Sequence, residues 1–347
     1  MSAFIDAARG QDAARAPIWI MRQAGRYLPE YREIKERYGF WEMCRTPDLI
    51  TEITLQPIRR FGMDAAILFS DIMTPLAECG VRIDFAPGPV IAEPVRTREQ
   101  IARLRTPGSD EIAPYVVKGV RAVREQTEVP LIGFAGAPLT LATYLVEGQG
   151  SKDYSLFRNW LYEQPGAAHE LLGKLTEVTI AYLRAQIGAG VQAVQLFDSW
   201  AGLHDAASYE TFGRPYADRV LRALGPGDVP RIYLAIGAHH LYPQIGTLAA
   251  EAISVDWRTP LSHARRMLPG KALQGNLDPS ALCAPPEVLL ERAGEVLRQG
   301  LGGPHIFNLG HGIGPSAPVG NVQRLVEFVQ GFDRTAAFDL TAEGATR

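Results

Sequence analysis

Short apolar runs rich in β-branched residues recur along this chain, most of them separated by segments with helical periodicity. Eight such runs can be counted, and none alternates polar with apolar residues as a half-exposed strand would. Strands buried on both faces and linked by helices are typical of the parallel sheet of an α/β protein. The number of runs favours a (β/α)8 TIM barrel with loop insertions, and a doubly wound open sheet is the alternative. The runs are Pro17–Met21, Ala65–Phe69, Pro130–Phe134, Val191–Phe197, Arg231–Ile236, Ala252–Trp257, Ala272–Leu277 and His305–Leu309.

Amphipathic stretches between the runs predict crossover helices, for example over Ala168–Ile187, Tyr209–Leu224 and Pro286–Gln299. One segment departs from this rhythm. After the second run, Val81–Phe85 and Val90–Ala92 flank a turn rich in proline and glycine. Such a turn between two short apolar pieces predicts an inserted β-hairpin.

We expect residues 1–347 to form a single catalytic barrel domain, since the chain shows no low-complexity tract and no short repeat. Residues 1–15 and 334–347 are rich in small residues or lack a clear apolar period. These two ends are therefore predicted to be loosely ordered termini.

The composition excludes several classes of protein. With 46% hydrophobic residues, 21% charged residues and a net charge of −3, the chain has no general affinity for nucleic acid or anionic membranes. There is no apolar run of transmembrane length and no signal-peptide pattern at the N-terminus, so a cytoplasmic location is expected. The cysteines are odd in number and widely scattered, which predicts neither disulfides nor a thiolate metal site; they are Cys44, Cys79 and Cys283.

Two arginines follow the first apolar run, four positions apart and separated by a glycine. In a parallel barrel the functional face lies at the carboxyl ends of the strands, so Arg22 and Arg26 are candidates for binding carboxylates or phosphates. An internal ion-pair cluster with Glu30 or Glu33 is the alternative. With a negative net charge overall, local arginines of this kind would have to capture any anionic substrate.

Polar residues of several types follow other predicted strands and should converge on the same rim. They are Asp71, Tyr144, Ser199 and His311. Each has a purely structural alternative. Asp71 could cap a helix or form an ion pair, Tyr144 could be a core aromatic residue, and Ser199 could cap the next helix. His311 lies between glycines, which leave the imidazole uncovered and favour a functional role.

With these residues assembled, the chain resembles the uroporphyrinogen decarboxylase family of haem biosynthesis from about Pro17 to Phe332. The most specific motif is Met-Arg-Gln-Ala-Gly-Arg-Tyr-Leu-Pro-Glu at residues 21–30. Weaker motifs are found at 69–72, 136–144, 197–202 and 308–312. Two positions depart from the common pattern: Trp200 stands where many relatives have His, and Leu139 where many have Trp.

The resemblance implies a cofactor-free, metal-free lyase of the cytosol, usually a homodimer, which converts uroporphyrinogen III to coproporphyrinogen III by removing four carboxyl groups as CO2. Matched position by position, it implies substrate binding by Arg22, Gln23, Ala24, Gly25, Arg26, Asp71, Tyr144, Ser199 and His311.

For chemistry of this kind, protonation of a pyrrole carbon turns the ring into an electron sink before CO2 leaves. Asp71 is the natural carboxylate to lie beneath the pyrrole N–H groups and stabilise the cationic ring. The proton donor stays open among Arg22, Tyr144 and His311. Arg22 is preferred, although its high pKa makes it a reluctant acid and the other two are chemically easier donors.

Two other functions compete with this reading. A methyltransferase of the same superfamily would need His and Cys ligands for zinc near the last strands, where Cys283 has no partner in the sequence. A tetrapyrrole carrier without catalytic activity would need the arginines but not Asp71.

Overall fold

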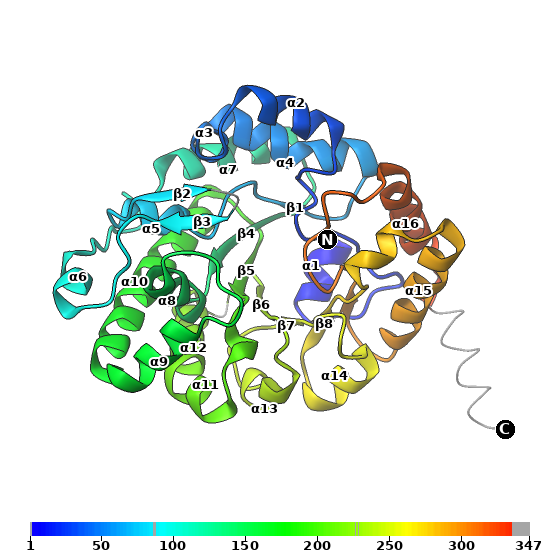
Figure 1. Ribbon diagram of the computed structural model, residues 1–347. Coiled ribbons are helices and arrows are strands. Elements are labelled where there is room, and N and C mark those ends of the chain that lie inside the picture. The colour runs from blue at the N-terminus through cyan, green and yellow to red at the C-terminus, as the bar shows by residue number, and fades with distance from the viewer. Residues whose placement is uncertain (1, 86–87, 226, 228, 335–347) are drawn as a thin grey trace.

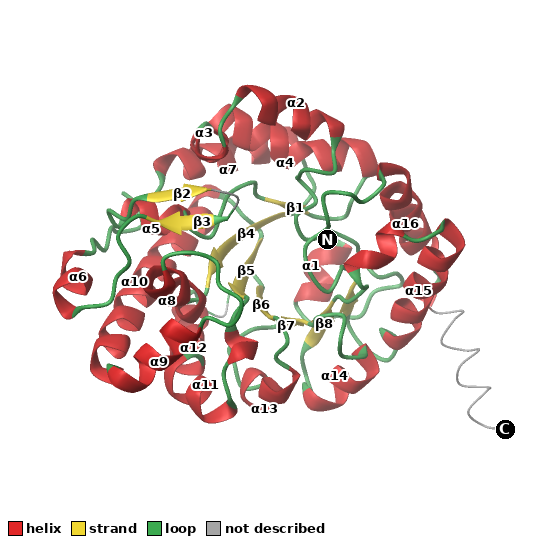
Figure 2. Cartoon of the chain, viewed as in Figure 1, coloured by secondary structure: helices red, strands yellow, loops and turns green. Residues whose placement is uncertain are grey.

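The inner layer of the fold is a sheet of seven parallel strands whose order follows the chain. Figures 1 and 2 show these strands grouped around a common centre, with helices on the outside. The computed structural model describes residues 2–85, 88–225, 227 and 229–334. The strands are β1 (Ala66–Ile67), β4 (Leu131–Gly136), β5 (Ala193–Asp198), β6 (Arg231–Ala235), β7 (Ala252–Ser254), β8 (Ala272–Gln274) and β9 (His305–Ile306).

This arrangement is TIM-barrel-like and confirms the predicted fold class. A doubly wound sheet requires a reversal of strand order, and the observed order has none. Every residue of β4, β5 and β6 is buried, as expected for strands covered on both faces. The carboxyl ends of the strands therefore share one rim, where the candidate residues were predicted to meet.

The first apolar run was predicted to be a strand, but it forms only a single bridge, between Ile18 and Phe307. On its other side, Asp64 N–H donates to the Ile18 carbonyl at 2.9 Å, so this run joins β9 to the start of β1. Side chains take the place of further ladder bonds. Ile18 N–H donates to the Asp64 carboxylate at 2.8 Å, and Ile20 N–H donates to Gln23 Oε1 at 3.0 Å.

The predicted hairpin is present as β2 (Ile83–Phe85) and β3 (Pro89–Ile91), which pair antiparallel. Residues 86 and 87 of its turn lie outside the described residues. The hairpin lies beside α5 (Figure 1), and Phe85 of β2 packs against Phe40 and Trp41 of α3.

Helices form the outer layer. They are α1 (Ala3–Ala8), α2 (Pro29–Arg37), α3 (Phe40–Arg45), α4 (Pro47–Phe61), α5 (Thr74–Glu78), α6 (Arg98–Arg103), α7 (Pro114–Gln126), α8 (Pro138–Glu147), α9 (Ser155–Glu163), α10 (Pro165–Ala189), α11 (Ala206–Phe212), α12 (Arg214–Ala223), α13 (Tyr242–Ile245), α14 (Leu261–Met267), α15 (Pro286–Gln299) and α16 (Val319–Gly331). Short 3-10 turns are η1 (Ala201–Leu203), η2 (His239–Leu241) and η3 (Pro279–Cys283).

Two of the three predicted crossover helices are found as single helices, α10 and α15. The third prediction was wrong, because the stretch from 209 to 224 belongs to two helices, α11 and α12, that meet at Gly213. Pro215 lies in the first turn of α12 and has no N–H to donate, so α11 cannot continue through it.

Within the N-terminal segment that was predicted to be loosely ordered, residues 3–8 depart from the prediction. Residues 3–8 form α1, and Phe4, Ala7 and Ala8 are fully buried in the main apolar core. The corresponding prediction for residues 334–347 falls almost wholly outside the described residues, and Arg334 itself is buried and ion-paired with Asp12.

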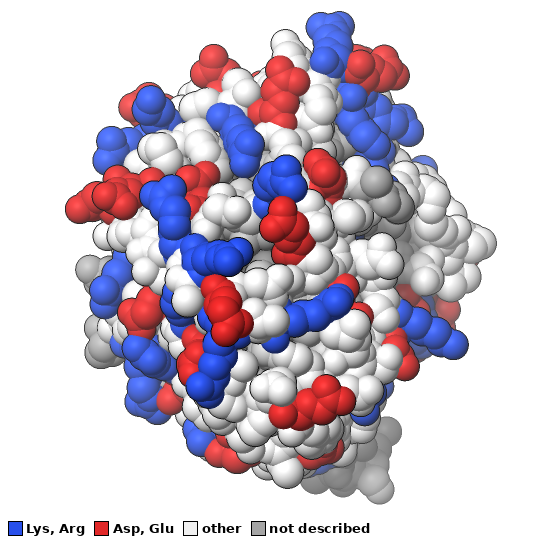
Figure 3. All heavy atoms as spheres, turned by 60° about the vertical axis from the view of Figure 1, so that its left-hand side comes forward, with Lys and Arg blue, Asp and Glu red and all other residues white. Residues whose placement is uncertain are grey.

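The face drawn in Figure 3 carries Lys and Arg interspersed with Asp and Glu. Its visible described residues form no continuous basic area, which agrees with the slightly negative net charge. No helix among the described residues is long and apolar enough to cross a membrane.

Candidate active site

Arg22 and Arg26 lie in the turn that follows the first run, and both are exposed. The alternative of an internal ion pair with Glu30 is wrong, because Glu30 pairs with Arg60 at 2.7 Å. Within the described ranges neither arginine forms an ion pair. Arg22 also adopts a φ of 66°, a left-handed conformation that is uncommon for a residue other than glycine and is often found at functional sites.

Gln23 was predicted to bind substrate, and its side chain is hydrogen-bonded to the backbone. Gln23 is fully buried, its amide oxygen accepts from Ile20 N–H, and its amide nitrogen donates to the Ala65 carbonyl at 3.1 Å. It holds the turn against the start of β1. Ala24 and Gly25 are half-buried, and no hydrogen bond to their N–H groups is found within the described part of the chain.

Asp71 lies four residues after β1 and is half-buried. Its Oδ1 accepts from Met73 N–H at 2.8 Å and so stabilises the turn before α5, but α5 has no side-chain N-cap bond, and Asp71 is therefore not the helix cap of the structural alternative. No described residue forms an ion pair with it. Burial raises the pKa of Asp71, and the Met73 hydrogen bond and the positive charge of Arg22 oppose that shift.

Tyr144 on α8 belongs to an aromatic cluster beside the rim. Its ring makes edge-to-face contacts with Tyr154 at 6.1 Å and with Trp200 at 6.0 Å between centroids. Burial raises the pKa of Tyr144, the side chains of Trp200 and Tyr154 oppose this, and the charge of Asp71 adds to it. The hydroxyl is therefore protonated near neutral pH and can donate a hydrogen bond.

Ser199 is half-buried in the turn after β5, and its hydroxyl caps no helix in the described structure. The residue before it anchors this turn. Asp198 is fully buried and accepts from Thr140 Oγ1 and from Tyr233 Oη, both at 2.7 Å. Burial raises the pKa of Asp198 to about 6. Thr140 in turn accepts from Trp200 N–H at 3.3 Å.

His311 lies beyond β9 and is half-buried. Gly312 N–H donates to its Nδ1 at 2.7 Å, so the ring proton is on Nε2. Burial lowers the pKa of His311, and the positive charge of Arg22 lowers it further. The imidazole is thus held neutral, with one N–H available as a donor.

Arg22 connects these groups electrostatically, because its charge acts on the pKa of Asp71, Tyr144 and His311 alike. It is also in close contact with the His311 segment: a Cβ built on Gly312 would lie 2.5 Å from Arg22 Cδ. No hydrogen bond or ion pair between described residues joins Arg26 to this group; its charge acts on the pKa of Tyr31.

Sequence reasoning missed two supports of this rim. Asn308 Oδ1 accepts from Met21 N–H at 3.0 Å and from Leu309 N–H at 2.7 Å, which joins the first and last segments of the barrel. Trp257 and Arg258 lie just beyond β7, with Trp257 at 6.2 Å from His311 between ring centroids. Arg258 directly follows the predicted run 252–257, and this position was the signal that could have indicated it.

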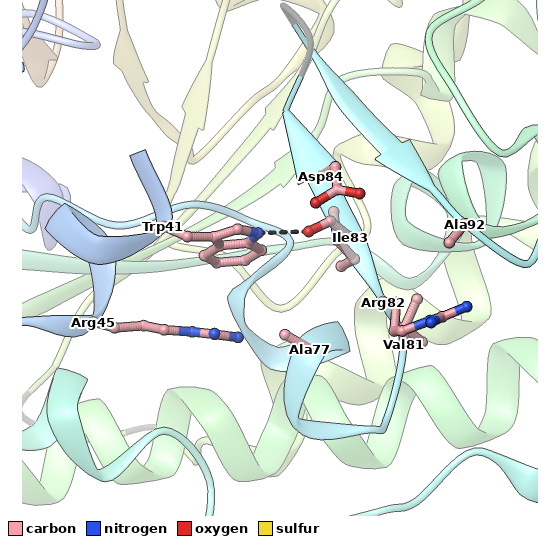
Figure 4. Close-up of a pocket in the computed structure, with 8 residues that line it drawn as sticks. All are labelled: Trp41, Arg45, Ala77, Val81, Arg82, Ile83, Asp84 and Ala92. Carbon is pink, nitrogen blue, oxygen red and sulfur yellow. Dashed lines mark hydrogen bonds between the residues drawn. The ribbon is translucent and has the colours of Figure 1, made fainter. Parts of the chain in front are cut away.

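A cavity of about 600 Å³ lies elsewhere, between α3, α5 and the hairpin (Figure 4). None of the predicted site residues lines it. Three of its polar side chains have partners: Trp41 Nε1 donates to the Ile83 carbonyl, Arg45 stacks on Trp41, and Arg82 pairs with Glu93. Among the described residues, no three His, Cys, Asp or Glu side chains are grouped to hold a metal ion.

Comparison with solved structures supports the fold. A methyltransferase from Methanosarcina mazei superposes with a TM-score of 0.77 at 19% identity, covering 94% of this chain and 97% of that one. A B12-independent methionine synthase from a Shewanella species gives 0.59 at 12% identity, covering 95% and 97%. At these identities the likeness shows the fold alone.

Comparison at the level of sequence is more specific. The family model described as uroporphyrinogen decarboxylase (URO-D) matches residues 1–332. Proteins named uroporphyrinogen decarboxylase are 47% identical in a Nocardioides species, covering 96% of this chain and 97% of the relative, and 48% identical in Nocardia farcinica, covering 94% and 95%. One from Geobacter metallireducens is 45% identical, covering 94% and 97%. The chain therefore belongs to the uroporphyrinogen decarboxylase family, which confirms the resemblance and the enzyme class predicted from the sequence.

Proposed function

We propose that this chain removes CO2 from the four acetate side chains of uroporphyrinogen III to give coproporphyrinogen III. The observation that carries the proposal is a half-buried carboxylate without an ion pair among the described residues, Asp71, within electrostatic reach of the exposed Arg22. A carboxylate in this setting can accept hydrogen bonds from several pyrrole N–H groups at once. Exposed guanidiniums suit the peripheral carboxylates of the same substrate.

In the proposed mechanism, a proton is added to a pyrrole carbon and the ring becomes cationic. The C–C bond to the acetate carboxylate then breaks, and its electron pair flows into the ring as CO2 leaves, which produces an exocyclic methylene group. A second proton adds to this methylene carbon to give the methyl group, and the first proton leaves the ring carbon, which restores the neutral pyrrole. Asp71 stabilises the cationic ring. Its raised pKa reflects the cost of a buried negative charge, and a positive ring held above it offsets that cost.

The remaining residues bind and orient the substrate in this proposal. Tyr144 and His311 each offer a single hydrogen-bond donor, and Ser199 supplies a hydroxyl. Arg22 and Arg26 pair with substrate carboxylates, and the Ala24 and Gly25 N–H groups add backbone donors. The resemblance also implies a homodimer in the cytoplasm that works without a cofactor, and we retain these as part of the proposal.

Anaerobic incubation of the purified protein with uroporphyrinogen III tests the function directly. We expect stoichiometric CO2 release and accumulation of the tetracarboxylate product, measured by chromatography after oxidation. A tetrapyrrole carrier would bind the same compound and release no CO2, so binding without release would favour that alternative. Family membership favours the decarboxylase over a methyltransferase, and among the described residues no group of His, Cys, Asp and Glu side chains near Cys283 is arranged to hold a zinc ion.

The pH dependence of kcat should reflect the two perturbed side chains. Asp71 must be ionised, so turnover should fall as the pH is lowered through its raised pKa, at a pH above the ordinary carboxyl range of about 4. His311 is neutral near pH 7, because its pKa is lowered, and is a poor source of the ring proton. If Arg22 is the proton donor, kcat should not decline as the pH rises from about 6 to about 9, because the guanidinium stays protonated over this range. If kcat of the wild type does decline over this range, and the decline is absent only in His311→Asn, then His311 is the proton donor instead.

Gly312→Ala should weaken catalysis through Arg22. The new Cβ would lie 2.5 Å from Arg22 Cδ and 3.0 Å from Nε, so the guanidinium must move. We expect kcat/KM to fall by about tenfold, the equivalent of one lost hydrogen bond to a charged group, with little change in Tm. Gly314→Ala is the matched control, because no atom lies within 4 Å of its added Cβ. Equal kcat/KM in Gly312→Ala and Gly314→Ala would contradict a role in catalysis for the close contact between Gly312 and Arg22.

A further inference from the structure

We propose that Arg258 is a third guanidinium of the substrate site, one that binds a peripheral carboxylate of the tetrapyrrole and so contributes to substrate specificity. The proposal rests on the proposed function and extends it to a residue outside the matched family motifs. Arg258 follows β7 at the carboxyl end of the strand, the rim that carries Asp71 and His311.

Arg258 is held in place from two sides. Its guanidinium carbon lies 3.9 Å from the centroid of the Trp257 ring, a distance typical of a cation–π contact. Its Nη1 donates to Asp256 Oδ2 at 3.2 Å. Asp256 is itself buried and accepts from Gly237 N–H and from Arg258 N–H, so it is a fixed support.

This support leaves part of the guanidinium free. The Arg258 side chain is 50% exposed, and Asp256 is the only carboxylate paired with it among the described residues. An arginine carries five N–H donors in a planar fork, so a single contact to Asp256 leaves others for a ligand carboxylate. A guanidinium already immobilised by stacking loses less conformational entropy when it binds.

A series of close contacts places Arg258 beside the other site residues. Trp257 lies edge-on to His311, and a Cβ built on Gly310 would lie 2.2 Å from Trp257 N, so the two segments touch directly. Gly312 of the same segment lies against Arg22. The charges of Arg22 and Arg258 both lower the pKa of His311, which places both guanidiniums within electrostatic reach of that ring.

The consequence is a rim on which two guanidiniums, those of Arg22 and Arg258, act on His311. The substrate of the proposed reaction carries a ring of carboxylates around its periphery, so one macrocycle can contact Arg22 and Arg258 together. A substrate with fewer carboxylates would lose one of these ion pairs, and Arg258 would thereby discriminate in favour of highly carboxylated tetrapyrroles.

The test compares Arg258→Gln, Arg258→Lys and the wild-type protein by steady-state kinetics with uroporphyrinogen III. We expect Arg258→Gln to raise KM about tenfold with kcat changed less than about threefold, because the ion pair is made equally in ground state and transition state. Arg258→Lys should recover part of the affinity. Arg222→Gln is the matched control, since Arg222 is also exposed and paired with an aspartate, Asp218, on α12.

Direct binding of uroporphyrin, the oxidised octacarboxylate that cannot react, separates this inference from the proposed function. It is measured by quenching of tryptophan fluorescence. If the wild type releases no CO2 but binds uroporphyrin, a tenfold weaker Kd in Arg258→Gln still supports the carboxylate site. The assignment of Arg258 to the substrate site would be overturned if KM and Kd were unchanged in Arg258→Gln. It would also be overturned if KM and Kd rose equally in the control variant Arg222→Gln. Absence of both binding and turnover in the wild type would overturn both proposals.

Discussion

Asp71→Asn is expected to abolish most turnover while the protein stays folded. A unit positive charge on the pyrrole ring about 4 Å from the carboxylate, at an effective dielectric near 20, is stabilised by about 4 kcal/mol. Since each ~1.4 kcal/mol changes a rate tenfold, kcat should fall by about three orders of magnitude. The amide oxygen of Asn can still accept from Met73 N–H, so the turn before α5 is preserved.

Thermal unfolding provides the second measurement on this variant. Burial raises the pKa of Asp71, so the neutral form is the one that the folded state favours. Any stability from this group is present below its unfolded pKa and is lost as the pH rises through its folded pKa. Near neutral pH, Asp71→Asn should therefore keep or raise Tm. Asp84→Asn on β2 is the control: it removes an exposed carboxylate and should change neither kcat nor Tm. Near-normal turnover in Asp71→Asn would refute the assigned role.

Arg22→Lys is expected to have the second-largest effect. Lysine keeps the positive charge but lacks the planar guanidinium group that binds a carboxylate through two hydrogen bonds. The substitution is therefore not conservative at such a site. We expect kcat/KM to fall by about a hundredfold, corresponding to about 2.7 kcal/mol of lost transition-state stabilisation. Steady-state kinetics with uroporphyrinogen III measures this directly.

The backbone at Arg22 offers an independent check. Its φ of 66° is unfavourable for any side chain, and residues held in such conformations cost about 1–3 kcal/mol each. Arg22→Gly removes that strain, so it should match or exceed the wild-type Tm while losing activity. A large drop in Tm would show instead that the Arg22 side chain is needed for folding, and the catalytic interpretation of Arg22→Lys would then fail.

The parallel sheet could be predicted because its strands are buried on both faces, which leaves apolar runs without alternation. The first run misled the prediction for a local reason. Its apolar residues are buried, but the side chains of Asp64 and Gln23 take the hydrogen bonds that a strand would make. The hydrogen bond between Ile18 and Asp64 joins residues more than forty positions apart in the chain. No local sequence pattern reveals a contact of this kind.

The site was predictable to the extent that it follows strand ends. Arg22, Asp71 and His311 were placed on one rim by topology alone, and in the structure the charge of Arg22 acts on both Asp71 and His311. Gln23 shows what a matched motif does not reveal, since the hydrogen bonds of its buried side chain to the backbone appear only in the structure. Arg258 shows the opposite limit: its importance depends on packing against Trp257 and Asp256, which only coordinates reveal.

The join between the first run and the last strand has a consequence for biosynthesis of the protein. Phe307 N–H donates to the Pro17 carbonyl at 2.8 Å, and Ile313 N–H donates to the Met21 carbonyl at 2.9 Å. Arg22 and His311 therefore meet only after nearly the whole polypeptide has left the ribosome. A nascent chain can therefore hold no complete tetrapyrrole site. A ligand that contacts both Arg22 and His311 should stabilise the pairing of the first and last chain segments, and it should slow amide hydrogen exchange in both segments together.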